Sequence, residues 1–225
     1  MAYTCNGRTN TDMVNRLKAE GLFSDPRVES ALLSVDRGDF TNATPYRDSP
    51  MSIGYNATIS APHMHATALQ NLKDHLVEGS RALDVGSGSG YLTACMAAMV
   101  GVTGKVIGIE HIPQLVQMGK DNIAKHHKDY LTTGRVEMVE GDGRLGYPIE
   151  GGYNAIHVGA AAPTLPEELL QQMADGGRMV IPVGSTHQTF YQVDRVGNDF
   201  RKTSLHGVIY VPLTTRDKQL RGDRS

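Results

Sequence analysis

Three glycines and two acidic residues have the spacing of a small-molecule site. In "LDVGSGSGY" an apolar run ends at Asp84-Val85 and is followed by Gly86, Gly88 and Gly90. Glycines at the end of a strand allow a tight turn into a helix and bring backbone N–H groups close to a ligand. Glu110 ends the next apolar run, 20 residues beyond the last glycine. A carboxylate there can accept hydrogen bonds from both ribose hydroxyls.

A further acid follows the third apolar run. It is Asp142, in "VEGDGRLGY", and the carboxyl ends of parallel strands meet at the edge of the sheet where ligands bind. An ordinary Asp-Gly turn is the alternative interpretation of this position.

Two cofactor classes fit these residues: a nicotinamide dinucleotide and S-adenosyl-L-methionine. A dinucleotide loop follows the pattern G-x-G-x-x-G, whereas this chain has G-x-G-x-G. The early third glycine and the acids after two strands favour a ligand with one adenosine and no pyrophosphate. A cationic sulfonium also suits an acidic rim better than a pyrophosphate does.

The stretch "ATISAPHMHATAL" places Ser60 ahead of a helical pattern, with His63 and His65 inside it. Ser-Ala-Pro before an apolar helix is typical of a helix cap, so Ser60 is either a cap or a group that acts on a substrate. No metal is expected on the two histidines, because residues two apart on a helix do not face each other. His65 either lines the cofactor site or packs in the core.

The elements that would position these residues alternate between strands and helices, which predicts an α/β fold with a doubly wound parallel sheet. Two helices come first, in "NTDMVNRLKAEG" and "DPRVESALLSV", followed by a polar loop over 41–58. The expected strands are 81–85, 105–110, 135–140, 154–158 and 178–183, with helices near 90–100, 113–127 and 166–174. The runs 189–196 and 204–211 alternate like an antiparallel pair.

Length and composition fit one domain over 1–225, with helices and a loop in 1–60 and the α/β core with its C-terminal strands in 61–225. A formal charge of −2 gives no basic field for nucleic acid. We expect no membrane association, because the most apolar run, "YLTACMAAMVGV", is too short to span a bilayer. Two cysteines make no disulfide framework, so we expect the cytosol.

Several stretches together resemble one family, the protein-L-isoaspartate (D-aspartate) O-methyltransferases. They are "VDRGDF", "ATISAPHMHA", "ALDVGSGSGYLTA", "GKVIGIEHI", "GRVEMVEGDGRLGY", "AIHVGAAAP", "GGRMVIPVG" and "GVIYVPLT". The resemblance implies a Rossmann-like methyltransferase fold: a mostly parallel seven-stranded sheet with rearranged C-terminal strands and N-terminal helices. It implies methyl transfer from S-adenosyl-L-methionine to isoaspartyl, and by extension D-aspartyl, carboxylates in damaged proteins and peptides. The products would be S-adenosyl-L-homocysteine and an ester that collapses through a succinimide.

The resemblance also assigns roles to single residues. The implied cofactor contacts are Ala57, Thr58, Ile59, Ser60, His65, Asp84, Gly86, Ser87, Gly88, Glu110, His111, Asp142, Gly143, Thr214 and Gln219. Within that set, Glu110 resembles the ribose-binding acid, Asp142 and Gly143 the adenine contact, and Ser60 the serine that acts on the substrate carboxylate. The chain departs from the family at Asp175, where a proline is common, and in a tail without aromatic residues. The family also implies a monomer.

The expected chemistry limits what Ser60 does. A carboxylic acid with a pKa of about 3.9 is already ionised at neutral pH, so its attack on a sulfonium methyl needs no general base. The sequence shows no base with an orienting partner for Ser60, which is therefore expected to orient the substrate rather than to act as a nucleophile. Two alternatives remain at this point: a nicotinamide-dependent oxidoreductase, and a binding or RNA-modifying protein on the same fold.

Overall fold

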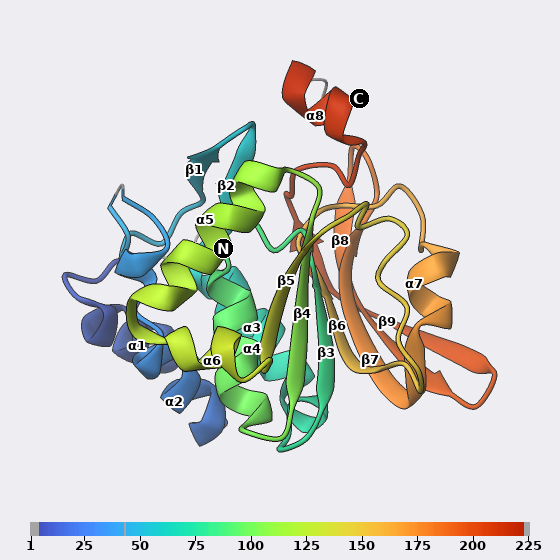
Figure 1. The fold of residues 1–225 in the computed structure, drawn as a ribbon, viewed down its shortest axis with the longest axis horizontal. Helices are drawn as coiled ribbons and strands as arrows, with labels where there is room; N and C mark the ends of the chain where they lie inside the picture. Colours follow the sequence, from blue (N-terminus) through green and yellow to red (C-terminus); the bar gives the residue numbers. More distant parts are fainter. Residues whose placement is uncertain (1–4, 43, 223–225) are drawn as a thin grey trace.

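The computed structural model describes residues 5–42 and 44–222, and its centre is a seven-stranded sheet (Figure 1). The strand order is β5-β4-β3-β6-β7-β8-β9. The strands are β3 (Arg81–Val85), β4 (Lys105–Glu110), β5 (Val136–Glu140), β6 (Tyr153–Val158), β7 (Met173–Val183), β8 (Gln188–Val196) and β9 (Asp199–Val208). The pairs from β5 to β7 are parallel and the last two are antiparallel. The predicted fold class, including the added final strands, is confirmed.

The central strands are apolar runs because both faces of the sheet are covered. Alternate side chains point to opposite faces, so Ala82 and Val106 join one apolar cluster while Leu83 and Ile107 join the other. Because β3, β4 and β6 run parallel, their carboxyl ends lie at one edge of the sheet, where the glycine loop begins.

The helices cover the two faces unequally (Figure 1). One side of the sheet carries α1 (Asn10–Ala19), α2 (Pro26–Ser34), α3 (Pro62–Leu72), α4 (Tyr91–Val100), α5 (Pro113–His126) and α6 (Lys128–Thr132). The short α7 (Glu167–Gln171) lies on the other side. Among the described residues, no helix is both long and apolar enough to cross a membrane.

The loop expected over 41–58 contains a small hairpin, so that prediction is wrong. Strands β1 (Met51–Gly54) and β2 (Ala57–Ile59) pair antiparallel. Their two connecting residues, Tyr55 and Asn56, have φ of 53° and 56°. Positive φ at both positions is what a type I′ hairpin turn requires. A tyrosine is uncommon in that conformation, which is why no turn was predicted at this position.

Two strands also differ from their predicted bounds by more than one residue. Strand β7 begins at Met173 instead of 178, because "ADGG" forms a register shift in the strand rather than a turn. Gly176, with φ of 73°, supplies the backbone conformation that this irregularity needs. Strand β9 starts earlier than expected and ends at Val208, so residues 209–211 leave the sheet. They lead to a short C-terminal helix, α8 (Arg216–Arg221).

Candidate functional site

The glycine loop after β3 uses its backbone amides inside the protein. The Ile109 carbonyl accepts from the amides of Gly86 (2.9 Å) and Ser87 (3.1 Å), and the Ser87 carbonyl accepts from Gly90 (2.9 Å). The Gly88 amide donates to Glu110 Oε2 at 3.2 Å. Four amides of the loop therefore have hydrogen-bond partners within the protein. A pyrophosphate is bound by such amides, so this loop is a poor phosphate cradle.

Gly86 and Gly90 differ in the space that surrounds them. A Cβ added to Gly86, which has φ of 74°, would meet nothing within 4 Å. That position is open space beside the loop. A Cβ on Gly90, with φ of 88°, would lie 3.1 Å from the Gly119 Cα. Gly90 thus allows α4 and α5 to pack closely.

Glu110 connects the end of β4 to the glycine loop. Its side chain is buried; beyond the Gly88 bond, Oε1 accepts from the Ile112 amide at 3.0 Å. Burial raises the pKa of this carboxyl, and the hydrogen bonds from the Ile112 and Gly88 amides oppose the rise. Glu110 is therefore a fixed acceptor at the strand end, as the sequence predicts.

A cavity beside the loop joins the two stretches that the sequence analysis singled out. It is lined by Thr58, Ile59, Ser60, His65, Asp84, Gly86, Ser87, Gly88, Ser89, Tyr91, Leu92, His157 and Gly159. The Ser87 hydroxyl oxygen is buried and has no hydrogen-bond partner in the part of the chain that the structure describes. A buried hydroxyl without a hydrogen-bond partner costs free energy. The cavity wall therefore suits a ligand with polar groups.

Ser60 is not the cap of α3. The N-cap is Ala61, without a side-chain hydrogen bond, so the capping interpretation is off by one residue. Asp48 instead reaches the first turn from the preceding loop, where its Oδ1 accepts from the His63 amide at 3.1 Å. The Ser60 side chain lies beside Tyr210 and lowers the pKa of its hydroxyl, whereas burial, the larger cause, raises it.

Arg37 fixes the backbone at Ser60 from inside the protein. Its fully buried guanidinium donates to the carbonyls of Ser60 and Pro45, each at 2.8 Å, and lies 3.2 Å from His65 Nδ1. Burial lowers the pKa of this guanidinium to about 10. Arg37 belongs to the "VDRGDF" stretch, for which the sequence analysis gave no chemical role.

Asp84 forms a second buried network below the loop. Its Oδ2 accepts from the Thr93 hydroxyl at 2.6 Å, and its Oδ1 lies 2.8 Å from His157 Nδ1. His157 was not predicted as a site residue. The signal was present, because His157 lies near the carboxyl end of β6, which pairs directly with β3.

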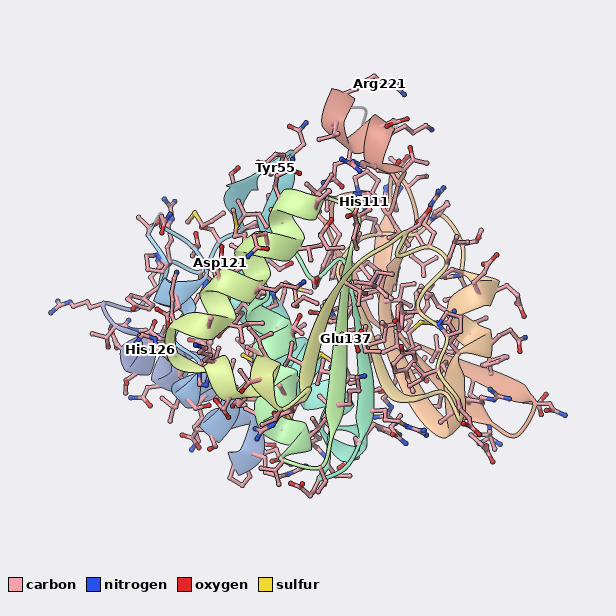
Figure 2. All side chains as sticks on the ribbon, in the orientation of Figure 1. Tyr55, His111, Asp121, His126, Glu137 and Arg221 are labelled. Atoms are coloured by element: carbon pink, nitrogen blue, oxygen red, sulfur yellow. The ribbon has the colours of Figure 1, made fainter. Side chains whose placement is uncertain are left out.

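Two further predicted residues, His111 and Gln219, form a half-buried rim outside the cavity lining. His111 Nε2 lies 2.8 Å from Gln219 Oε1, and the Gln219 amide nitrogen donates to the Tyr55 carbonyl at 3.1 Å. Asn56 donates to the Gln219 carbonyl at 2.9 Å. Figure 2 shows Tyr55, His111 and Arg221 at one end of the molecule, where the β1–β2 turn meets α8.

Four predicted contacts lie at the margins of this arrangement. The Asp142 carboxylate is held by the Arg144 guanidinium, which lowers the pKa of Asp142. A Cβ on Gly143 would come within 2.7 Å of Val85 Cγ1, so glycine is needed there. Thr214 directly precedes Thr215, the N-cap residue of α8, and does not line the cavity. Ala57 packs against the apolar core instead of lining the cavity.

Fold and site together define a class. A parallel sheet ordered around β3, a glycine loop after that strand and an acid at the end of its neighbour are typical of Rossmann-like enzymes that bind an adenosine cofactor. The chain belongs to the protein-L-isoaspartate(D-aspartate) O-methyltransferase family, whose model matches residues 8–218. The resemblance stated from the sequence is thereby confirmed.

Relatives and solved structures agree with this membership. The chain is 52% identical over 221 residues to a protein-L-isoaspartate O-methyltransferase of Caenorhabditis elegans, covering 97% of this chain and 98% of the relative. It is 51% identical to protein-L-isoaspartate O-methyltransferase 1 of Arabidopsis thaliana, with 95% of each covered. A Plasmodium falciparum structure, described as a putative member of the family in complex with S-adenosyl-L-homocysteine, has a TM-score of 0.86 and 36% identity, and covers 92% of this chain and 99% of that chain. These findings overturn the nicotinamide oxidoreductase alternative.

Proposed function

We propose that this chain transfers the methyl group of S-adenosyl-L-methionine to the free carboxylate of L-isoaspartyl residues in damaged proteins and peptides, and by extension of D-aspartyl residues. The observation that carries the proposal is the single cavity that Ser60 shares with the glycine loop. The family membership supports the choice of cofactor and substrate.

The polar groups of the cavity and of the residues outside its lining fit this cofactor. When bound, S-adenosyl-L-methionine supplies an electrophilic methyl group on a sulfonium. Glu110 would accept from the ribose hydroxyls, and the unpaired Ser87 hydroxyl would meet a polar group of the amino-acid part. Asp142 and Gly143 would border the adenine, while His111, Thr214 and Gln219 would close the rim. None of these roles uses a phosphate cradle.

Ser60 would hold the substrate carboxylate in the direction of attack. Its carbonyl is fixed by Arg37 and its hydroxyl contacts Tyr210, so the hydroxyl has a defined place at the cavity wall. Productive attack needs the reacting atoms about 3 to 3.5 Å apart. Because the carboxylate is already ionised at neutral pH, orientation and exclusion of water are the tasks left to the protein.

The product ester would collapse to a succinimide without help from the protein, which makes the methylation a repair step. We further propose that residues 1–225 act as one methyltransferase domain, as a monomer in the cytosol, and without nucleic acid. The formal charge of −2 and sequence pI near 6.5 support the last point.

Radiolabelled methyl transfer tests the proposal. The protein is incubated with methyl-labelled S-adenosyl-L-methionine and an isoaspartyl peptide, next to the same peptide with the isoaspartyl carboxylate converted to an amide. We expect label in the first peptide as a base-labile ester and none in the second. Absence of label from the first peptide, in a folded protein that binds S-adenosyl-L-homocysteine, would refute the proposed substrate.

A further inference from the structure

Arg37 is an unusual buried cation. It lies in the short 3₁₀ helix Arg37–Asp39, is fully buried, and has only neutral hydrogen-bond partners: two carbonyl oxygens and a histidine nitrogen. The ion pairs found among the described residues do not include it. Burying a charge without an opposite charge in contact is costly, so this position calls for a reason beyond packing.

The bond to His65 fixes the state of that ring. A guanidinium has donors and no acceptor, so His65 Nδ1 must accept from Arg37 Nη1 across the 3.2 Å that separates them. The neutral ring then carries its proton on Nε2. Burial, followed by the charges of Arg37, His157 and His63, lowers the pKa of His65 well below its usual value. His65 is therefore a neutral ring with a single N–H.

That N–H belongs to the cavity side of the ring. His65 lines the cavity, and the hydrogen bonds of the described residues give its Nε2 no partner. The Tyr91 ring, with its centroid 5.1 Å from that of His65, holds the imidazole on one side, and the Arg37 guanidinium lies 5.4 Å from the Tyr91 centroid. Arg37, Tyr91 and His65 thus form one rigid wall.

The other cavity histidine, His157, contacts an acidic residue instead of a basic one. His157 Nδ1 lies 2.8 Å from Asp84 Oδ1, so the partner of this ring is a carboxyl group instead of a guanidinium. The Asp84 carboxyl group contacts both His157 and Thr93. The positive charge of Arg37 lies behind Ser60 and His65 and favours an anion on that side of the cavity.

We propose that Arg37 is a positioning residue that presents His65 to the cavity as a neutral Nε2–H donor for a carboxylate. The inference rests on the proposed function, which places two carboxylates in this cavity: the isoaspartyl carboxylate of the substrate and the α-carboxylate of the cofactor. Both have the same chemistry, and the experiment distinguishes them.

The ring state is measured directly by NMR. Long-range proton–nitrogen correlations of the ¹⁵N-histidine-labelled protein report which ring nitrogen of each histidine is protonated. His65→Gln assigns the resonances of His65 by their disappearance. We expect His65 to be neutral and protonated on Nε2 at pH 7. Protonation on Nδ1, or on both nitrogens, would overturn the proposal whatever the activity of the protein.

Variants then identify the carboxylate. Arg37→Lys keeps the charge but loses the planar fork that reaches Ser60 and His65 together. The matched control is Arg27→Lys, because Arg27 also donates to two carbonyls, of Leu76 and Lys73, at 3.1 and 3.0 Å, outside the cavity. Calorimetry compares S-adenosyl-L-homocysteine with 5′-methylthioadenosine, which lacks the amino-acid carboxylate.

If the cofactor carboxylate is the partner, Arg37→Lys and His65→Gln weaken S-adenosyl-L-homocysteine binding about tenfold and leave methylthioadenosine binding unchanged. If the substrate carboxylate is the partner, both ligands bind as in the wild type and the KM of the isoaspartyl peptide rises about tenfold. The control changes neither quantity. Equal loss of both ligands, or no change in any quantity, would overturn the proposal.

These readouts separate the inference from the proposed function. A wild type that binds S-adenosyl-L-homocysteine but does not methylate isoaspartyl peptides would remove the proposed substrate, while the ring state and the two-ligand comparison would still decide the role of Arg37. Should Arg37→Lys fail to fold, His65→Gln carries the same comparison.

Discussion

The two halves of the site are built in different ways. In the cavity half, Ser60, His65 and Asp84 contact Arg37, Tyr210 and His157, and most of these groups are buried. In the rim half, Gln219 contacts Tyr55 and His111 through bonds near the surface. Buried hydrogen bonds fix side chains strongly, whereas exposed ones compete with water. The comparison indicates that the side chains of the cavity half are held more firmly in place than those of the rim half.

The largest effect is expected from Ser60→Ala, because an orienting hydrogen bond contributes most in the transition state. Loss of one such donor lowers kcat on the order of 10²-fold, while the affinity for S-adenosyl-L-homocysteine stays within about twofold. Steady-state kinetics and calorimetry check both numbers. Turnover within twofold of wild type would remove Ser60 from the reaction.

Glu110→Gln should weaken S-adenosyl-L-homocysteine binding by about tenfold or more, because charge-assisted bonds to the ribose become neutral ones. The variant also tests a pH dependence. Burial raises the pKa of Glu110 in the free protein, and only the ionised form accepts from both hydroxyls. Wild-type affinity should therefore fall as the pH drops through that raised pKa, and the variant should lose this fall. An unchanged affinity in a folded variant would place the ribose elsewhere.

Tyr210→Phe should lower kcat about fivefold, which corresponds to one neutral hydrogen bond, since it removes only the hydroxyl that contacts Ser60. Phe190, whose ring is stacked on Tyr210 with centroids 6.3 Å apart, would keep the new ring in place. In a Ser60→Ala background the same change should have no further effect. The control is Tyr191→Phe on β8, whose ring lies under Lys202. Additive losses in the double variant would show that Tyr210 acts independently of Ser60.

The smallest effect is expected at the rim. Gln219→Ala removes the bonds to His111 and the Tyr55 carbonyl, which lie near the surface, and should weaken S-adenosyl-L-homocysteine binding about threefold. Stopped-flow binding should show most of that change in the dissociation rate. A loss as large as that of Glu110→Gln would contradict the distinction between the two halves.

The sequence predicted best what depends on local pattern. The apolar runs placed β3 and β4 with their exact bounds, and the glycine loop followed by Glu110 gave the ligand edge of the sheet. These features repeat with the period of a strand or sit at its end. The β1–β2 hairpin was missed because Tyr55 adopts a conformation that its residue type rarely takes.

Contacts between residues far apart in the chain could not be predicted from local sequence patterns. The contact of Arg37 with His65 joins residues 28 apart, and that of Asp84 with His157 joins residues 73 apart. Nothing in "VDRGDF" indicates that its arginine lies behind Ser60. The alternative interpretation of Ser60 as a cap is wrong for a similar reason, because Asp48 supplies the acceptor at the start of α3.

The most direct test of the account is a matched pair of peptides that differ only in an isoaspartyl or a normal aspartyl linkage. The free carboxylate and its flanking amides are arranged differently in the two isomers, so a rigid cavity wall around Ser60 and His65 cannot satisfy both. A site that leaves buried polar groups unpaired with the wrong isomer discriminates by roughly 10⁴ to 10⁵ in kcat/KM. We predict rapid methyl incorporation into the isoaspartyl peptide and essentially none into its isomer. Comparable rates on both peptides would contradict the account and leave a general carboxyl methyltransferase.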